Sequence, residues 1–226
     1  MDETEDESYA AFLAERREEI LQRIAEAAAR AGRDPSEVEL LAVSKTVDVP
    51  QVNLAWKAGY LAFGENRPQE LVRKLKGLAA YPQMDGARFD MIGHLQTNKV
   101  REVVGNVTLI QSVSSLHLAE AISKRGVSHD VTSDVLLEVN VSGEESKSGF
   151  SPDEVRAALD DILALPALRV RGLMTMAPAH DMDAARRTFS GLRELRDELA
   201  SITARFNDSS KDYQAMMETA RDLRAQ

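Results

Sequence analysis

The chain has 226 residues, of which 43% are hydrophobic and 29% charged, so it can bury a substantial core and has the composition of a globular protein. The formal net charge of -9 disfavours nucleic acid and anionic membranes as partners, because both are negatively charged. The absence of cysteine excludes disulfides, thiolate catalysis and zinc–thiolate sites.

The N-terminal segment carries neither of the common targeting patterns. It begins MDETEDES, whereas a secretory signal begins with basic residues and a mitochondrial presequence is rich in arginine and poor in acids. No apolar run approaches the roughly 20 residues that span a bilayer. We therefore expect a cytoplasmic protein. Residues 1–7 are expected to form a flexible acidic tail, and residues 8–226 a single domain.

Short apolar runs alternate with segments of helical spacing along the whole chain. Pro50 suits the first turn of a helix, and Ser151-Pro152-Asp153-Glu154 is a capping box with proline at the first helical position. The expected strands are 38–43, 60–63, 89–92, 107–111, 135–141 and 168–174. The expected helices are 8–31, 51–58, 68–78, 97–104, 115–125, 152–163 and 183–205, the last with Phe189, Leu192, Leu195 and Leu199 on its apolar face.

Strands that are each followed by a helix predict a parallel α/β protein. The two common architectures are a barrel and an open doubly wound sheet. Polar motifs follow many different strands of this chain, and in a barrel every strand end opens onto one shared mouth, whereas an open sheet has one crevice. This distribution favours the barrel and leaves the open sheet as the alternative.

Lys45 is the first residue that could carry chemistry. It lies in Ala42-Val43-Ser44-Lys45-Thr46, directly after the first expected strand. Partial desolvation at a barrel mouth would disfavour its ammonium form, which frees the amine to attack an aldehyde. The alternative is an ordinary solvated lysine in a loop.

Two polar motifs follow the second and third expected strands. In Phe63-Gly64-Glu65-Asn66 the amide of Asn66 could contact a ligand ring or cap a helix. In IGHLQTNK, His94 could act as a base or stack on a ring, or it could satisfy a backbone carbonyl while Thr97 caps a helix. Spacing alone leaves these alternatives open.

Two further segments lie near the ends of later strands. Glu138 and Asn140 alternate with apolar residues and are expected to face a barrel interior, with Lys147 or an arginine as the partner of Glu138. The loop that follows them contains glycines and serines, and suits either a ligand cover or a plain turn. In RGLMTMAP, Met174 is expected in the core or in a pocket wall.

The motifs AVSKT, FGEN, IGHLQTNK, VNVSGEESKSGF and RGLMTMAP occur in the order found in the pyridoxal-phosphate homeostasis proteins, also called the YggS-like group, and the chain resembles that family from about Leu40 to Leu199. The resemblance implies a single-domain (β/α)8 TIM-type barrel of fold type III, similar to the N-terminal domain of alanine racemase without its C-terminal β domain. It implies that Lys45 holds pyridoxal 5′-phosphate (PLP) as a Schiff base. It further implies cofactor contacts for Asn66, His94 and Met174.

The resemblance implies intracellular binding, storage and delivery of PLP without catalytic turnover, since the racemases take a second acid–base residue, a tyrosine, from the domain expected to be absent here. PLP-dependent apoenzymes are then the candidate partners, and a monomer or weak dimer is expected. The alternatives are an amino-acid racemase or lyase, and a relative that has lost PLP binding. The C-terminal part departs from the family pattern, because Phe206-Asn207-Asp208 runs into Ser209-Ser210 without the glycine–methionine segment of the phosphate cup. Ser209 and Ser210 are the remaining phosphate-contact candidates, and a true shortening stays open.

Overall fold

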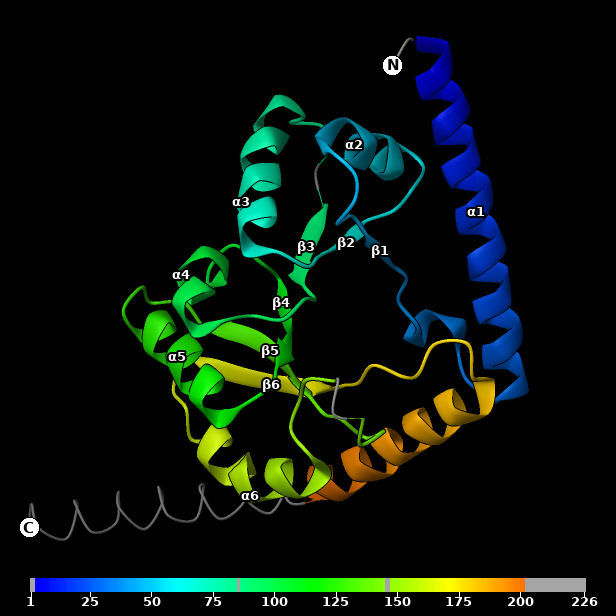
Figure 1. The fold of residues 1–226 in the computed structure, drawn as a ribbon. Coiled ribbons are helices and arrows are strands. Elements are labelled where there is room, and N and C mark those ends of the chain that lie inside the picture. Colours follow the sequence, from blue (N-terminus) through cyan, green and yellow to red (C-terminus); the bar gives the residue numbers. More distant parts are fainter. Residues whose placement is uncertain (1–2, 85, 145–146, 202–226) are drawn as a thin grey trace, which may run out of the picture. The chain divides into compact units, whose positions relative to one another are not determined.

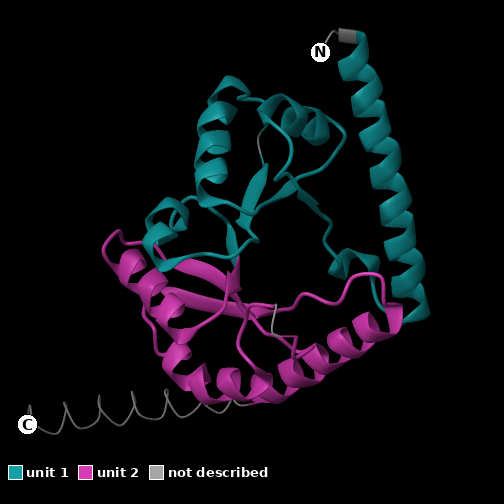
Figure 2. Ribbon diagram, viewed as in Figure 1, with its two compact units in different colours: residues 1–110 teal, residues 111–226 magenta. Residues whose placement is uncertain are grey.

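A computed structural model describes residues 3–84, 86–144 and 147–201 of the chain (Figure 1). The chain divides into two compact units, residues 1–110 and 111–226 (Figure 2). The division runs through strand β4 (Leu109–Val113). Strands and helices alternate in both units, and neighbouring strands within each are consecutive in the sequence and parallel, as the sequence predicts.

The first unit begins with the long helix α1 and then alternates strands with helices. Its strands are β1 (Leu41–Val43), β2 (Ala62–Glu65), β3 (Arg88–Met91) and the beginning of β4. Its helices are α1 (Glu3–Arg30), α2 (Val49–Lys57), α3 (Pro68–Gly77) and α4 (Val100–Val103), with 3-10 turns at η1 (Pro35–Glu37), η2 (Leu78–Ala80) and η3 (Thr97–Lys99).

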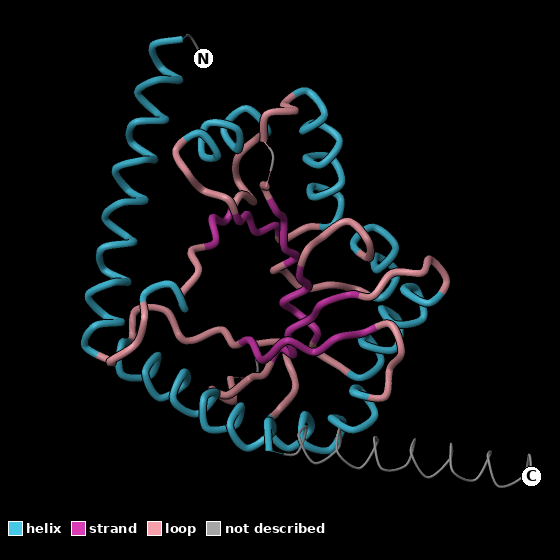
Figure 3. Tube along the Cα trace, turned by 180° about the vertical axis from the view of Figure 1, so that it is seen from behind, coloured by secondary structure: helices cyan, strands magenta, loops and turns pink. Residues whose placement is uncertain are grey.

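The register of the first three strands aligns their carboxyl ends. Val43 pairs with Gly64 and Gly64 with Asp90, so the segments that follow β1, β2 and β3 leave the sheet at the same edge. Figure 3 shows α2 and α3 on one side of these strands. The motifs that the sequence places after three different strands therefore share one edge of the first unit.

The core of the first unit lies between its strands and helices. The rings of Phe63 and Phe89 stack with centroids 5.3 Å apart, and Leu71 of α3 and Met91 of β3 are fully buried. Gly64 faces the other side of β2 from Phe63, where a Cβ would lie 2.5 Å from a methyl group of Leu41.

Helix α1 packs against α2, and the hydroxyl of Tyr60 donates a hydrogen bond to the carbonyl of Leu13 across 3.3 Å. The helix begins at Glu3, so its expected start at Ser8 and an acidic tail reaching residue 7 are wrong. Acidic residues near a helix N-terminus interact favourably with the helix dipole, so the acidic composition of this segment favours a helix.

The second unit repeats the strand–helix pattern. It contains α5 (Leu116–Val127), β5 (Ser133–Glu138), α6 (Pro152–Leu163), β6 (Leu168–Met174) and a helical segment at 182–201. Strands β5 and β6 pair along their whole length with an irregularity after Val135, where Leu136 pairs with Gly172. The capping box at Ser151 is confirmed, because its hydroxyl accepts a hydrogen bond from the Glu154 amide at 3.2 Å.

Buried aliphatic residues form the core of this unit, and Val135, Leu137, Ile122, Val155 and Ile162 are all fully buried. In the segment 182–201, Leu195 and Leu199 are buried as the spacing predicts. Phe189, however, is 55% exposed and Thr188 is buried in its place. The buried face therefore passes through Thr188 and Leu195, two turns apart, and the position of Phe189 on that face was wrong.

The six strands found in the described residues match the six expected from the apolar runs. The seventh and eighth strands of a (β/α)8 barrel would follow residue 201 and lie outside the described residues, as do Ser209 and Ser210. None of the helices that the structure describes is both long and apolar enough to cross a membrane.

Candidate functional site

Lys45 lies in the turn that connects β1 to α2 and is exposed. Within the described part of the chain, no hydrogen bond or ion pair involves its side-chain amine. An exposed amine without a carboxylate partner is accessible to a carbonyl compound, which is the first requirement for Schiff-base chemistry.

The residue before it, Ser44, is fixed to β2. The Ser44 amide donates to the Gly64 carbonyl at 2.9 Å, which extends the β1–β2 pairing by one residue beyond Val43. The Ser44 hydroxyl donates to Glu65 Oε1 at 2.8 Å, and the side chain of Ser44 is buried. Lys45 is thus the first residue after the part of the backbone that pairs with β2.

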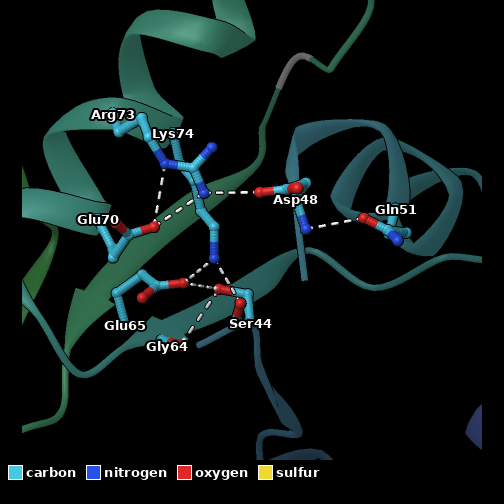
Figure 4. A network of polar contacts seen from close by, with 8 residues as sticks. All are labelled: Ser44, Asp48, Gln51, Gly64, Glu65, Glu70, Arg73 and Lys74. Atoms are coloured by element: carbon cyan, nitrogen blue, oxygen red, sulfur yellow. Dashed lines mark hydrogen bonds and ion pairs between the residues drawn. The ribbon is translucent and has the colours of Figure 1, made fainter. Parts of the chain in front are cut away.

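A buried ion pair lies behind Ser44 (Figure 4). Lys74 of α3 donates to Glu65 Oε1 and to the carbonyl oxygen of Ser44, and the side chains of Lys74 and Glu65 are 1% and 0% exposed. Leaving either charge without the other would cost about 3–5 kcal/mol. The pair therefore fixes α3 to β2 and to the residue that precedes Lys45.

The other end of the Lys45 turn is connected to α3 by an exposed contact. Arg73, the neighbour of Lys74, contacts Asp48 at 2.6 Å and Glu70 at 2.8 Å. Its hydrogen bonds to Asp48 and Glu70 raise the pKa of the Arg73 guanidinium. The Asp48 amide in turn donates to Gln51 in the first turn of α2 at 2.7 Å. Helix α3 thus holds the segment 44–48 at both ends, by a buried contact and by an exposed one.

Asn66 follows β2 and lies next to Gly93 of the third motif. Asn66 is half-buried, and its side-chain amide has no hydrogen-bond partner in the region that the structure describes. A Cβ on Gly93 would lie 2.2 Å from the Asn66 carbonyl oxygen, so only glycine permits this approach of the two strand ends. The Ile92 amide donates to the Glu65 carbonyl at 2.9 Å and fixes the same register.

The polar side chains of the third motif extend into solvent. His94, Gln96 and Asn98 are all exposed. The alternative in which Thr97 caps a helix is wrong: Gln96 is the cap residue of the 3-10 turn, and it makes no side-chain capping bond. The Lys99 amine forms an ion pair with Glu102 at 3.0 Å, whereas the Lys45 amine has no such partner in the described residues.

In the second unit, Met174 is the last residue of β6, pairs with Glu138 and is half-buried. The side chain of Asn140, which was expected to face a barrel interior, makes its hydrogen bonds within its own loop. Its amide donates to the carbonyl of Glu144 at 2.8 Å, and its oxygen accepts from Ser142 Oγ and the Gly143 amide at 3.0 Å each.

The Lys74–Glu65 pair was not predicted from the sequence. Lys74 lies three residues after the fully buried Leu71, on the same face of α3, and a lysine on the buried face of a helix requires a partner. The position of Lys74 on this face could have indicated a buried ion pair, but the sequence does not show which acidic residue is its partner.

Comparison with known proteins identifies the family. The family described as alanine racemase, N-terminal domain, matches residues 16–219. The pyridoxal phosphate homeostasis protein of Aquifex aeolicus is 41% identical over 186 residues, which cover 82% of this chain and 80% of that protein. The chain belongs to the pyridoxal phosphate homeostasis protein family. The family expected from the motifs is therefore confirmed.

Solved structures support the same relationship. PipY of Synechococcus elongatus, solved with PLP bound, is 32% identical, has a TM-score of 0.66, and the match covers 79% of this chain and 82% of PipY. A crystal structure of a Bifidobacterium adolescentis protein is 41% identical, with a TM-score of 0.81 over 89% of this chain and 83% of that protein. The fold is that of the alanine racemase N-terminal domain.

Proposed function

We propose that this chain binds pyridoxal 5′-phosphate at Lys45 and serves intracellular PLP homeostasis by binding, storing and delivering the cofactor. The observation that carries the proposal is the exposed amine of Lys45, which has no partner among the described residues, on a backbone that β2 and α3 hold in place. Membership of the homeostasis protein family and the PLP bound to PipY support it.

The chemistry of the available groups fits this cofactor. After losing a proton to solvent, the Lys45 amine adds to the aldehyde carbon of PLP, and the aldehyde oxygen leaves as water, so that a carbon–nitrogen double bond replaces the carbon–oxygen one. The amide of Asn66, which has no hydrogen-bond partner in the described residues, offers both a donor and an acceptor to a ring substituent. Gly93 brings the segment after β3 against the backbone of Asn66, which fixes where the Asn66 side chain begins. These features assign Lys45 the covalent contact and Asn66 a polar one.

The remaining assignments follow from the family. We assign His94 and Met174 further contacts with the cofactor, and Ser209 and Ser210, outside the described residues, contacts with its phosphate. The family match at residues 16–219 extends over both units and supports one barrel domain. Cytoplasmic delivery of PLP to apoenzymes by a monomer or weak dimer belongs to the same proposal, and light scattering at several protein concentrations tests the oligomeric state.

Absorption spectroscopy with peptide mapping tests the proposal. Titration of the purified chain with PLP is expected to produce the absorption band of a protonated Schiff base, and borohydride reduction is expected to leave the cofactor on the Lys45 peptide. Lys45→Ala should abolish both signals. Lys57→Ala is the matched control, because it removes another exposed lysine of the same unit. Labelling of Lys99 or Lys147 in the wild-type chain would show the assignment to be wrong.

A further inference from the structure

Two adjacent cations of α3 hold the two ends of the segment that contains Lys45. Lys74 donates to the carbonyl oxygen of Ser44, immediately before Lys45, and Arg73 contacts the carboxylate of Asp48, three residues after it. The two contacts differ in their surroundings: the Lys74 side chain is 1% exposed, whereas the side chains of Arg73 and Asp48 are 52% and 65% exposed.

Solvent decides the relative strength of these two contacts. An exposed ion pair contributes about 0–1 kcal/mol, because water and salt screen it and two long side chains must be ordered. A buried ammonium group has no water to replace its partners, so each of its acceptors is held firmly. The backbone at Ser44 is therefore constrained much more strongly than the backbone at Asp48.

Glu65 connects the Lys74–Ser44 contact to strand β2. Its Oε1 accepts hydrogen bonds from both Lys74 and the Ser44 hydroxyl. The Ser44 amide and the Ile92 amide donate to the carbonyls of Gly64 and Glu65, so the β2 backbone beneath the pair is itself fixed on both sides. The carbonyl of Ser44 thus has a donor whose position is set by the sheet.

From this geometry, and on the basis of the proposed function, we infer that the buried Lys74–Glu65 pair is a positioning device for Lys45. Lys74 holds the Ser44 carbonyl, and the peptide plane that contains this carbonyl also contains the amide nitrogen of Lys45. Rotation of that plane would change the direction in which the Lys45 side chain leaves the backbone. Lys74 itself makes no contact with the cofactor and acts through this peptide plane.

Lys74→Met tests the inference, because methionine keeps an unbranched side chain, one atom shorter, and removes the donor. This single variant also leaves Glu65 buried and unpaired, so its stability is expected to fall. The double variant Glu65→Met/Lys74→Met removes both charges, together with Glu65 Oε2, a buried oxygen without a hydrogen-bond partner in the described residues. Replacement of a buried ion pair by apolar residues is often neutral for stability, so the double variant is expected to fold.

Stability and cofactor binding should therefore separate in the double variant. We expect its urea midpoint to return close to that of the wild type, while its affinity for PLP stays about tenfold lower, the factor that corresponds to 1.4 kcal/mol. Arg73→Met is the matched control: it removes the neighbouring cation and the exposed contact to the same segment, and its affinity for PLP should stay within about twofold of the wild type.

A second measurement does not depend on the cofactor. Competitive acetylation with acetic anhydride, read by peptide mass spectrometry, gives the reactivity of Lys45 relative to the exposed Lys57. We expect this ratio to change about threefold or more in the double variant, which is the factor that corresponds to the free energy of one hydrogen bond. In Arg73→Met the ratio should stay unchanged.

The outcomes distinguish this inference from the proposed function. If the wild-type chain and Arg73→Met fail to take up PLP, the proposed function is wrong, and the acetylation ratio still decides whether Lys74 positions Lys45. If the wild-type chain binds PLP and the folded double variant matches it in affinity and acetylation ratio, the pair is only structural and the inference is overturned.

Discussion

Because Gly93 lies so close to Asn66, a single methyl group added at Gly93 is expected to lower the stability of the fold substantially. A Cβ on Gly93 would lie 2.2 Å from the carbonyl oxygen of Asn66, 2.6 Å from its Cα and 2.8 Å from its carbonyl carbon. Favourable contacts between such atoms are about 3.5 Å long, so one strand end must move by roughly 1 Å. All three atoms belong to the backbone, and rotation of a side chain cannot relieve the overlap. We expect Gly93→Ala to destabilise the fold by about 1–3 kcal/mol.

Urea unfolding measures this effect. With a denaturant slope of about 2 kcal/mol/M, a loss of 2 kcal/mol lowers the midpoint by about 1 M. Gly191→Ala is the matched control, because Gly191 lies in the helical segment 182–201 and the nearest atom to its Cβ would be a side-chain methyl group of Val141 at 3.0 Å. Alanine is favoured over glycine inside a helix by about 0.5–1 kcal/mol, so this midpoint should be unchanged or higher.

The result that refutes the argument is an unchanged midpoint for Gly93→Ala. Such a result would mean that the ends of β2 and β3 do not approach each other at Asn66. The variant also tests the role of Asn66, because movement of its backbone should weaken PLP binding beyond what the loss of stability explains. A destabilised variant that binds PLP with wild-type affinity would remove Asn66 from the set of proposed contacts.

Three further predictions concern activity, pH and capping. Alanine racemisation by the PLP-loaded chain is expected not to exceed that of free PLP, and clear turnover in a chiral assay would favour the racemase alternative. Burial raises the pKa of Tyr60 above its ordinary value of 10.0, so the unfolded chain loses this proton first and the free energy of unfolding should fall above about pH 10. In urea unfolding at several pH values, Tyr60→Phe should lose less stability above about pH 10 than the wild type, and an equal loss in both proteins would contradict this. Ser151→Ala should cost about 1 kcal/mol through the lost cap of α6, and a calorimetric midpoint equal to that of the wild type would show that the cap contributes nothing.

Local patterns were sufficient to predict most of the fold. The apolar run Leu168–Met174 forms β6 with the bounds expected from its composition, and the capping box at Ser151 begins α6 as its spacing predicts. Both features depend on neighbours close in sequence. The strand expected at 38–43 is shorter, because Val38 ends the 3-10 turn η1 and pairing begins only at Leu41.

The sequence pattern did not predict the orientation of two side chains, Asn140 and Phe189. Asn140 has the alternating position of an inward-facing strand residue, yet β5 ends at Glu138 and its side chain folds back on its own loop. Phe189 is apolar at helical spacing, yet the helix rotates Thr188 and Leu195 into the core instead. In both cases the sequence pattern fits two orientations. Hydrogen bonds within the loop select one for Asn140, and burial of Thr188 and Leu195 selects one for the helix.

The two lysines nearest to Ser44 show why the candidate site needed both kinds of information. The motif around Lys45 was recognisable because the chemistry of an amine at a strand end is local. That chemistry also requires the amine to remain free, which depends on where the nearby acid is directed. Glu65 is adjacent to Asn66 and lies in the strand next to β1, but Lys74 and the Ser44 hydroxyl engage its Oε1 on the side of the strand that α3 covers. One buried lysine therefore occupies the nearby carboxylate, and the exposed lysine remains without an ion-pair partner in the described residues.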